Sequence, residues 1–204
     1  MGIGVDDLKL RGVTWVLSRV CLETEYLPLH GDTVIAQTGP TEPSRFFVPR
    51  HVLLTSELTG KTVAQATCFW LMLDIKTKTV VHPWNHYPKV DVAEPCLEFF
   101  ANPQRLDNTP GISPLEFTAR NSCIDFNRHV NNRFYFSFAQ DWLSEQYHAP
   151  VQILGIQINF NLPLVFGESI LCSGETDGNH FRVVGNSSDD RNIFTAAGTF
   201  SLQQ

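Results

Sequence analysis

The apolar positions along the chain predict mainly β-structure, arranged in two similar blocks. In the first block, β-branched and aromatic residues predict strands at residues 13–26 and 61–75. In the second block, the same kind of pattern predicts strands at residues 151–161 and 192–202. A glycine followed by an acidic, a hydroxyl and a β-branched residue lies between the two strands of each block. The chain is therefore expected to consist largely of strands joined by turns.

The two blocks match in the order of their elements. When Gly31 is aligned with Gly167, the first strand of one block falls over the first strand of the other. The later strands align at a slightly smaller offset, with Val63 over Ile193, which is consistent with a shorter hairpin in the second block. Self-similarity of this kind favours a tandem duplication of one structural unit.

The second block also contains a long predicted helix. A strand is predicted at residues 115–124, and a helix follows at residues 131–148. The apolar positions of this helix form one stripe with several neighbours beside it: Phe134, Phe138, Trp142 and Leu143, then Tyr135, Phe136 and Ala139. A helix that is apolar around most of its surface is expected to be wrapped on several sides. One long helix wrapped by a curved antiparallel sheet describes a hot-dog unit, so we predict an α+β protein with a tandem (double) hot-dog fold.

Prolines mark the boundary between the two predicted units. Six of the twelve prolines fall at residues 82–114, which predicts an irregular connector. The expected domains are an N-terminal unit at residues 1–82, a connector at 83–114 and a C-terminal unit at 115–204.

The first unit is expected to be truncated at its N-terminus. Fewer residues precede Gly31 than separate residue 115 from Gly167, so the first strand and most of the helix are expected to be missing. Residues 5–12 are then predicted to be the tail of that helix, with Gly12 as its C-cap.

Composition and charge exclude several classes of function. The net charge of −6 at pH 7 gives no global basic surface for nucleic acid. The longest uninterrupted apolar run, residues 68–73, is far shorter than the ~20 residues of a membrane-spanning helix. Asp6 and Asp7 stand where a secretory signal would place basic and then apolar residues. We therefore expect a cytoplasmic protein with no membrane span.

The cysteines predict no structural metal. The chain has five cysteines, which are scattered and form neither a CxxC motif nor a zinc-ligand pair. We expect them to be small buried hydrophobic residues in a reducing compartment.

Candidate chemistry is concentrated just before the predicted helix. If residues 123–132 are extended, the alternate residues Asp125, Asn127 and His129 share a face. A carboxylate, an amide and an imidazole beside a helix N-terminus suit hydrolysis: free helix N–H groups polarise a carbonyl oxygen while Asp125 or His129 activates water. The spacing fits equally well an ordinary cap, with Asn131 as N-cap, turn residues before it and an exposed His129.

The same residues resemble a known enzyme family. The segment DFNRHVNNRFYFSFAQDW, which begins at Asp125, closely resembles the D-x-N-x-H-V-N-N signature of acyl-acyl-carrier-protein (acyl-ACP) thioesterases, the double hot-dog enzymes that end fatty-acid synthesis. The segments GVTWVLSRVCLETEYLPLHGD from Gly12 and FWLMLDIKTKTVVHP from Phe69 resemble strands of that family's first unit. The resemblance covers nearly the whole chain. It implies hydrolysis of the thioester that joins a fatty acyl chain to the carrier's phosphopantetheine arm, with no cofactor and no metal.

The resemblance also implies roles for individual residues. The family's catalytic residues fall on Asp125 as base or nucleophile, His129 as its polar partner, and Asn127 orienting water or the carbonyl group. A further glutamate that the family commonly carries on the next strand is matched here by Pro163, and Glu168 lies five residues later, in the turn.

Substrate contacts are expected on both sides of this motif. Arg128 and Arg133, together with Arg120, flank it and are predicted to hold phosphate or acidic groups of the carrier, although ordinary solvated arginines fit equally well. Asn131 and Asn132 are predicted to contact substrate.

The resemblance places the acyl chain in a tunnel of the first unit. Strand residues 13–20 and 68–73, Trp15 among them, are predicted to line it, although large apolar residues there fit a filled core at least as well.

Two alternatives to an acyl-ACP thioesterase stay open. One is a hot-dog thioesterase acting on acyl-coenzyme A. The other is a catalytically silent acyl- or carrier-binding protein, which Pro163 and the expected truncation favour. A hot-dog hydratase is less favoured because the Asn131-Asn132 context resembles thioesterases. The expected oligomeric state is a monomer or a homodimer.

Overall fold

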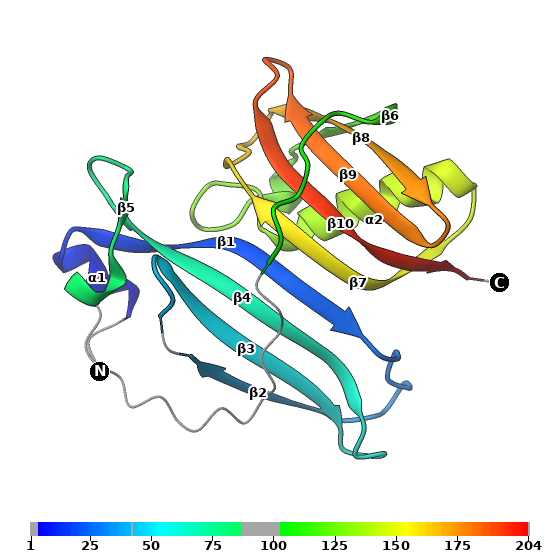
Figure 1. Cartoon of the computed structure of the whole chain (residues 1–204), viewed down its shortest axis with the longest axis horizontal. Coiled ribbons are helices and arrows are strands. Elements are labelled where there is room, and N and C mark those ends of the chain that lie inside the picture. Colours follow the sequence, from blue (N-terminus) through cyan, green and yellow to red (C-terminus); the bar gives the residue numbers. More distant parts are fainter. Residues whose placement is uncertain (1–3, 42, 87–102, 204) are drawn as a thin grey trace. The chain divides into compact units, whose positions relative to one another are not determined.

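The structure divides the chain into two units, each of which contains antiparallel strands (Figure 1). It is a computed structural model that describes residues 4–41, 43–86 and 103–203. The first unit is Met1–Asn102 and the second is Pro103–Gln204. The predicted boundaries of the connector, 83–114, remain a prediction.

The described part of the first unit is a sheet with one short helix. Its elements are α1 (Val5–Leu10), β1 (Val13–Thr24), β2 (Val34–Pro40), β3 (Phe47–Ser56), β4 (Thr62–Asp74), β5 (Val80–Val81) and a 3-10 helix at Pro83–Asn85. The second unit contains β6 (Ile112–Thr118), a 3-10 helix at Asn121–Cys123, α2 (Arg133–Tyr147), β7 (Val151–Phe160), β8 (Ser169–Asp177), β9 (His180–Ser187) and β10 (Asn192–Leu202).

The strand order of the first unit is repeated in the second. The antiparallel strands run β2-β3-β4-β1 in the first unit and β8-β9-β10-β7 in the second, where β6 continues the sheet beyond β8. β1 thus corresponds to β7, and β4 to β10, as the aligned sequence blocks predict. Gly31 and Gly167 have nearly the same positive φ, 90° and 84°, a conformation that favours glycine.

One predicted strand of the second unit is wrong in its bounds. Residues 115–124 were expected to continue as a strand, but β6 ends at Thr118 and the 3-10 helix follows. Ala119 exchanges backbone hydrogen bonds with Glu168 and Gly167, just before β8 begins at Ser169. The polar residues 120–122 then favour a turn over an extended strand.

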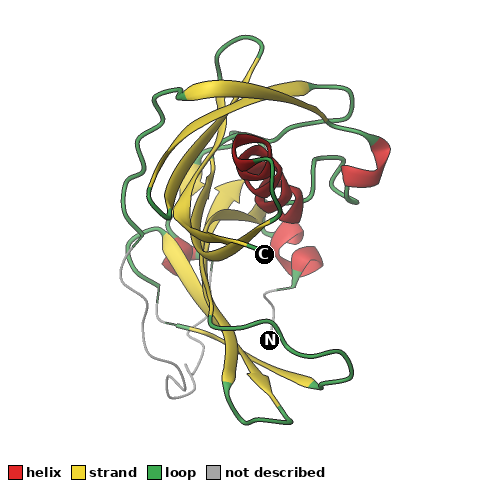
Figure 2. Ribbon diagram, turned by 90° about the vertical axis from the view of Figure 1, so that its right-hand side faces the viewer, coloured by secondary structure: helices red, strands yellow, loops and turns green. Residues whose placement is uncertain are grey.

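The long helix is buried along one face rather than around most of its surface. Its buried residues recur at helical spacing: Tyr135, Phe138, Ala139, Trp142 and Leu143. Phe134 and Phe136 are only half-buried, which corrects the predicted stripe, and Ser137 and Gln140 are exposed. Figure 2 shows this helix lying against the curved sheet.

Aromatic rings join α2 to the sheet. The Tyr135 ring contacts Phe160 of β7 and Phe194 of β10, with centroids 5.5 and 5.2 Å away, and Phe138 lies 4.8 Å from Phe117 of β6. The predicted α+β class, an antiparallel sheet with a central helix, is therefore present in the second unit.

The first unit has a small buried cluster at α1. Leu8, Val13 and Met72 are fully buried there, and Trp15 and Val81 pack against them. The Gly12 N–H donates to the Lys9 carbonyl oxygen (3.0 Å), and Gly12 has a φ of 75°. The C-cap of α1 is Arg11, so the predicted C-cap Gly12 is wrong by one residue; Gly12 is the left-handed residue that follows the cap.

The described cysteines are free thiols. Cys172 is buried, whereas Cys21, Cys68 and Cys123 are only half-buried, so the expectation of buried cysteines is met by one of these four. Burial raises the pKa of the Cys21 thiol to about 11. Cys96 lies outside the described residues.

Arg182 fixes the segment that precedes β6 to the second unit. Its guanidinium donates to the carbonyl oxygens of Asp107 (3.3 Å) and Thr109 (2.5 Å) and pairs with Glu175 (3.0 Å). The Arg182 side chain is 15% exposed. One side chain therefore holds the incoming chain against the β8–β9 hairpin.

We expect Arg182→Met to lower the free energy of unfolding by about 2 kcal/mol, because three acceptors lose a charged donor. Chemical denaturation would measure it. Arg191→Met is the matched control, since Arg191 forms a solvent-exposed pair with Asp189 and should matter far less. Equal losses in the two variants would contradict the role given to Arg182.

Candidate active site

The motif before α2 forms a tight hairpin. Ile124 and Val130 form an antiparallel bridge, and the Asp125 N–H donates to the His129 carbonyl oxygen (2.9 Å). The Arg128 N–H donates to the Asp125 carbonyl oxygen (3.0 Å), and Arg128 has a φ of 65°. A turn closed by a left-handed residue is the usual three-residue hairpin loop. Asp125 and His129 therefore stand opposite each other at the base of this loop.

From the sequence, Asp125 and His129 were expected to share a face because they alternate along an extended segment. The structure gives a different reason. The segment from Asp125 to His129 is a turn, so the alternation of an extended strand does not apply to it. Residues directly opposite in an antiparallel pair instead have their side chains on one face. The hairpin therefore sets the backbones of Asp125 and His129 opposite each other, and we expect their side chains to share a face, while Asn127 lies in the loop itself.

The Asp125 carboxylate orders the loop. Its Oδ1 accepts a hydrogen bond from the Asn127 N–H (2.8 Å), an Asx turn. Asp125 is half-buried, whereas Asn127 and His129 are exposed. Within the described part of the chain, the side chains of Asn127 and His129 make no hydrogen bond, so both are available to a ligand.

A second turn supports the hairpin from the other side. The Val130 N–H donates to the Leu164 carbonyl oxygen (2.7 Å), and His129 forms a bridge with Val165. Val165–Glu168 is a β-turn, in which the Glu168 N–H donates to the Val165 carbonyl oxygen (3.1 Å) and the Glu168 Oε2 accepts from the Val165 N–H (3.0 Å). Glu168 thus closes its own turn. Pro163, just before it, is exposed.

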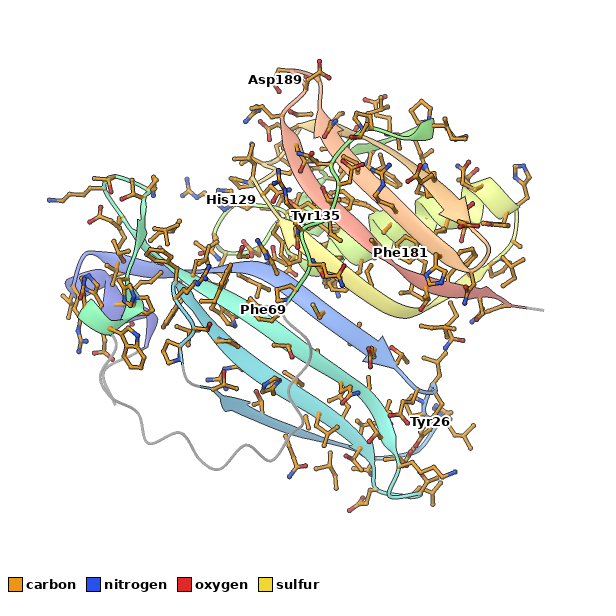
Figure 3. The ribbon with its side chains drawn as sticks, viewed as in Figure 1. Tyr26, Phe69, His129, Tyr135, Phe181 and Asp189 are labelled. Carbon is orange, nitrogen blue, oxygen red and sulfur yellow. The ribbon has the colours of Figure 1, made fainter. Side chains whose placement is uncertain are left out.

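Tyr135 is a further residue of the candidate site, and the sequence alone did not point to it. Burial raises the pKa of the Tyr135 phenol to about 12. A hydrogen bond with the Leu164 backbone acts in the opposite direction and lowers the pKa. The carboxylates of Glu168 and Asp125 add to the rise, so both lie within electrostatic range of the hydroxyl. Figure 3 marks Tyr135 and His129 in the second unit. In the sequence Tyr135 is one more apolar position of a helix, which gives no signal of this neighbourhood.

The first N–H groups of α2 are already occupied. Asn131 accepts from the Arg133 N–H through its Oδ1 (3.1 Å) and from the Phe134 N–H through its carbonyl oxygen (2.9 Å). The Asn132 carbonyl oxygen accepts from the Tyr135 N–H (3.3 Å). The expectation that free N–H groups of this helix polarise a carbonyl is therefore wrong for these three.

The other predicted substrate residues lie in separate places. Arg128 is in the hairpin loop and Arg133 begins α2, where its guanidinium lies 4.6 Å from the Phe134 ring centroid. Both arginines are exposed. Trp15 packs in the α1 cluster of the first unit. Substrate contact by these residues, and by Asn131 and Asn132, remains a prediction.

The described residues contain neither a candidate metal site nor a membrane-spanning helix. No group of three or more His, Cys, Asp or Glu side chains converges there. No described helix is long and apolar enough to cross a bilayer.

Two family models match the chain. The model of the acyl-ACP thioesterase N-terminal domain matches residues 1–85, and that of the acyl-ACP thioesterase C-terminal domain matches residues 109–201. The chain belongs to the acyl-ACP thioesterase family.

Curated relatives and solved structures agree with this family. An acyl-[acyl-carrier-protein] hydrolase of Cuphea viscosissima is 24% identical over 76% of this chain and 39% of its own length. Oleoyl-acyl carrier protein thioesterase 1 of Arabidopsis thaliana is 24% identical over 65% of this chain and 40% of its own length. The chain therefore spans about two-fifths of the length of these relatives.

Two solved structures of similar proteins show the same fold. An acyl-ACP thioesterase from Bacteroides thetaiotaomicron superposes with a TM-score of 0.77 at 22% identity, covering 98% of this chain and 82% of the other. The 12:0-ACP thioesterase from Umbellularia californica has a TM-score of 0.75 at 15% identity, covering 97% and 78%. The predicted double hot-dog fold is thereby confirmed for this acyl-ACP thioesterase family member.

The left-handed Arg128 allows a test of the hairpin. We expect Arg128→Gly to keep or raise the free energy of unfolding, by up to about 1 kcal/mol, because glycine adopts a positive φ without steric cost. Arg120→Gly is the matched control: Arg120 is exposed with a φ of −100°, so its replacement should lower stability by up to about 1 kcal/mol. Denaturant titration would measure both, and equal destabilisation would contradict the hairpin geometry.

Proposed function

We propose that the chain hydrolyses fatty acyl-ACP thioesters to a free fatty acid and ACP. The observation that carries the proposal is the hairpin that sets Asp125 opposite His129, with Asn127 in the loop between them. Membership of the acyl-ACP thioesterase family supports it, as do relatives named as acyl-ACP hydrolases and thioesterases. A carboxylate, an imidazole and a free amide can supply the general base and the hydrogen-bond donors that thioester hydrolysis uses.

Each of the three polar side chains has a role in the proposed hydrolysis. Asp125 accepts a proton from the attacking water, whose oxygen bonds to the carbonyl carbon. The exposed side chains of Asn127 and His129 supply donors for the carbonyl oxygen as negative charge develops on it. The carbon–sulfur bond then breaks, and the departing thiolate takes the proton to give a thiol. Alternatively the Asp125 carboxylate attacks the carbonyl carbon and expels the thiolate as the carbon–sulfur bond breaks. Water then hydrolyses the resulting anhydride, which restores the Asp125 carboxylate, releases the fatty acid and supplies the proton that the thiolate takes.

One observation supports a second candidate function, a catalytically silent protein that binds acyl chains or the carrier. Pro163 stands where the family resemblance expects a glutamate, and Glu168 is engaged in closing its own turn. This candidate predicts carrier binding without turnover. Hydrolysis of acyl-coenzyme A remains an alternative substrate class within the first proposal.

Asp125→Asn tests the proposed reaction. The amide retains an oxygen that accepts the Asn127 N–H, so the loop should stay folded while the base is lost. We expect release of thiol from long-chain acyl-ACP to fall about 100-fold or more. Asp141→Asn, on the exposed side of α2, is the matched control and should keep wild-type activity.

The outcomes separate the candidates. Retained activity in Asp125→Asn would contradict the role of this carboxylate. A folded wild-type chain that hydrolyses neither acyl-ACP nor acyl-coenzyme A would contradict the enzyme and favour the silent binding protein.

A further inference from the structure

Two phenylalanines stand exposed beside the candidate active site. Phe126 is 86% exposed and Phe166 is 66% exposed. Each occupies the second position of a β-turn: Phe126 in the turn from Asp125 to Arg128, and Phe166 in the turn Val165–Glu168. Neither ring contacts another aromatic ring in the described part of the chain. Burial in the core therefore does not account for them.

The two turns are fixed and lie side by side. The bridge between His129 and Val165 joins the strand that leaves one turn to the strand that enters the other. The Phe166 turn is also held to the end of β6, because the Gly167 N–H donates to the Ala119 carbonyl oxygen (2.9 Å). We call Phe126, Val165 and Phe166 the twin-turn surface. Its backbone is ordered by hydrogen bonds although its side chains are not buried.

An ordered, exposed aromatic pair is suited to binding a protein. Aromatic residues are enriched at the centres of protein interfaces and carry much of the binding energy there. A rigid backbone reduces the entropy lost when such side chains become ordered on binding. Val165, which is 36% exposed, extends the apolar area between the two turns.

The charges around the twin-turn surface favour an acidic partner. Arg120 and Arg128 are exposed, and neither forms an ion pair within the described residues. The nearby carboxylates of Asp125 and Glu168 are half-buried and accept hydrogen bonds from the Asn127 and Val165 N–H groups. The exposed charges of Arg120 and Arg128 therefore have the sign that suits contact with an acidic protein.

We propose that the twin-turn surface is the docking site of the acidic carrier protein, which binds there while its arm presents the thioester to Asp125. This inference rests on the proposed function, because the carrier is the substrate of that reaction. Phe126 follows Asp125 directly in the chain. A carrier protein bound to the Phe126 and Phe166 rings would therefore have its phosphopantetheine arm close to the hairpin. Arg120 and Arg128 meet the acidic groups of the carrier around the apolar contact.

Binding measured without hydrolysis tests the surface. A bacterial ACP in its holo form, with a free phosphopantetheine thiol and no acyl chain, is titrated against the chain by calorimetry. We expect the double variant F126S/F166S to weaken binding at least about tenfold. The control L171S replaces an apolar residue of β8 that is 48% exposed and should leave the dissociation constant unchanged. Binding should also weaken as salt is raised.

The outcomes distinguish this inference from the proposed function. If wild-type chain binds holo-ACP through the phenylalanines but hydrolyses no acyl-ACP, the docking site stands and the proposed reaction fails. If acyl-ACP is hydrolysed and F126S/F166S still binds holo-ACP as wild type does, the docking site is wrong and the reaction stands. A double variant that turns a dimer into a monomer would also overturn the proposal, because the surface would then join copies of this chain.

Discussion

The candidate site depends on one stretch of backbone pairing. The Val130 N–H binds the Leu164 carbonyl oxygen, and His129 pairs with Val165. These contacts tie the hairpin before α2 to the turn before β8. Without them a loop of mostly polar residues would lack a fixed conformation, since its side chains bury little apolar surface. With them, Asp125 and His129 are held opposite each other.

The helix and the sheet provide the rigid support for that pairing. α2 begins directly after the hairpin, and its first N–H groups are bound by Asn131 and Asn132. Tyr135, one turn into the helix, packs its ring on the sheet and sets its hydroxyl within range of two carboxylates. Tyr135 therefore both anchors the helix and places its hydroxyl near the carboxylates of Glu168 and Asp125.

The sequence predicted the duplicated fold because apolar alternation and turn glycines are local signals. The repeated order of elements along the chain and the approximate span of α2 followed from them, and the family signature located the polar motif. The loop geometry did not follow, because Arg128 adopts a left-handed conformation in which glycine is the usual residue. Tyr135 was missed for a related reason: only tertiary folding buries its phenol and brings the carboxylates of Glu168 and Asp125 near it. The one-sided burial of α2 likewise depends on which strands it contacts.

The central claim is that Asp125 and His129 act as one unit because the hairpin sets them on one face. A double-mutant cycle on the hydrolysis of long-chain acyl-ACP tests it most directly, with D125N, H129A and D125N/H129A compared with wild type. Residues that act together give non-additive losses. The account predicts that the double variant is about as slow as the slower single variant. Losses that multiply in the double variant would show independent action and contradict it.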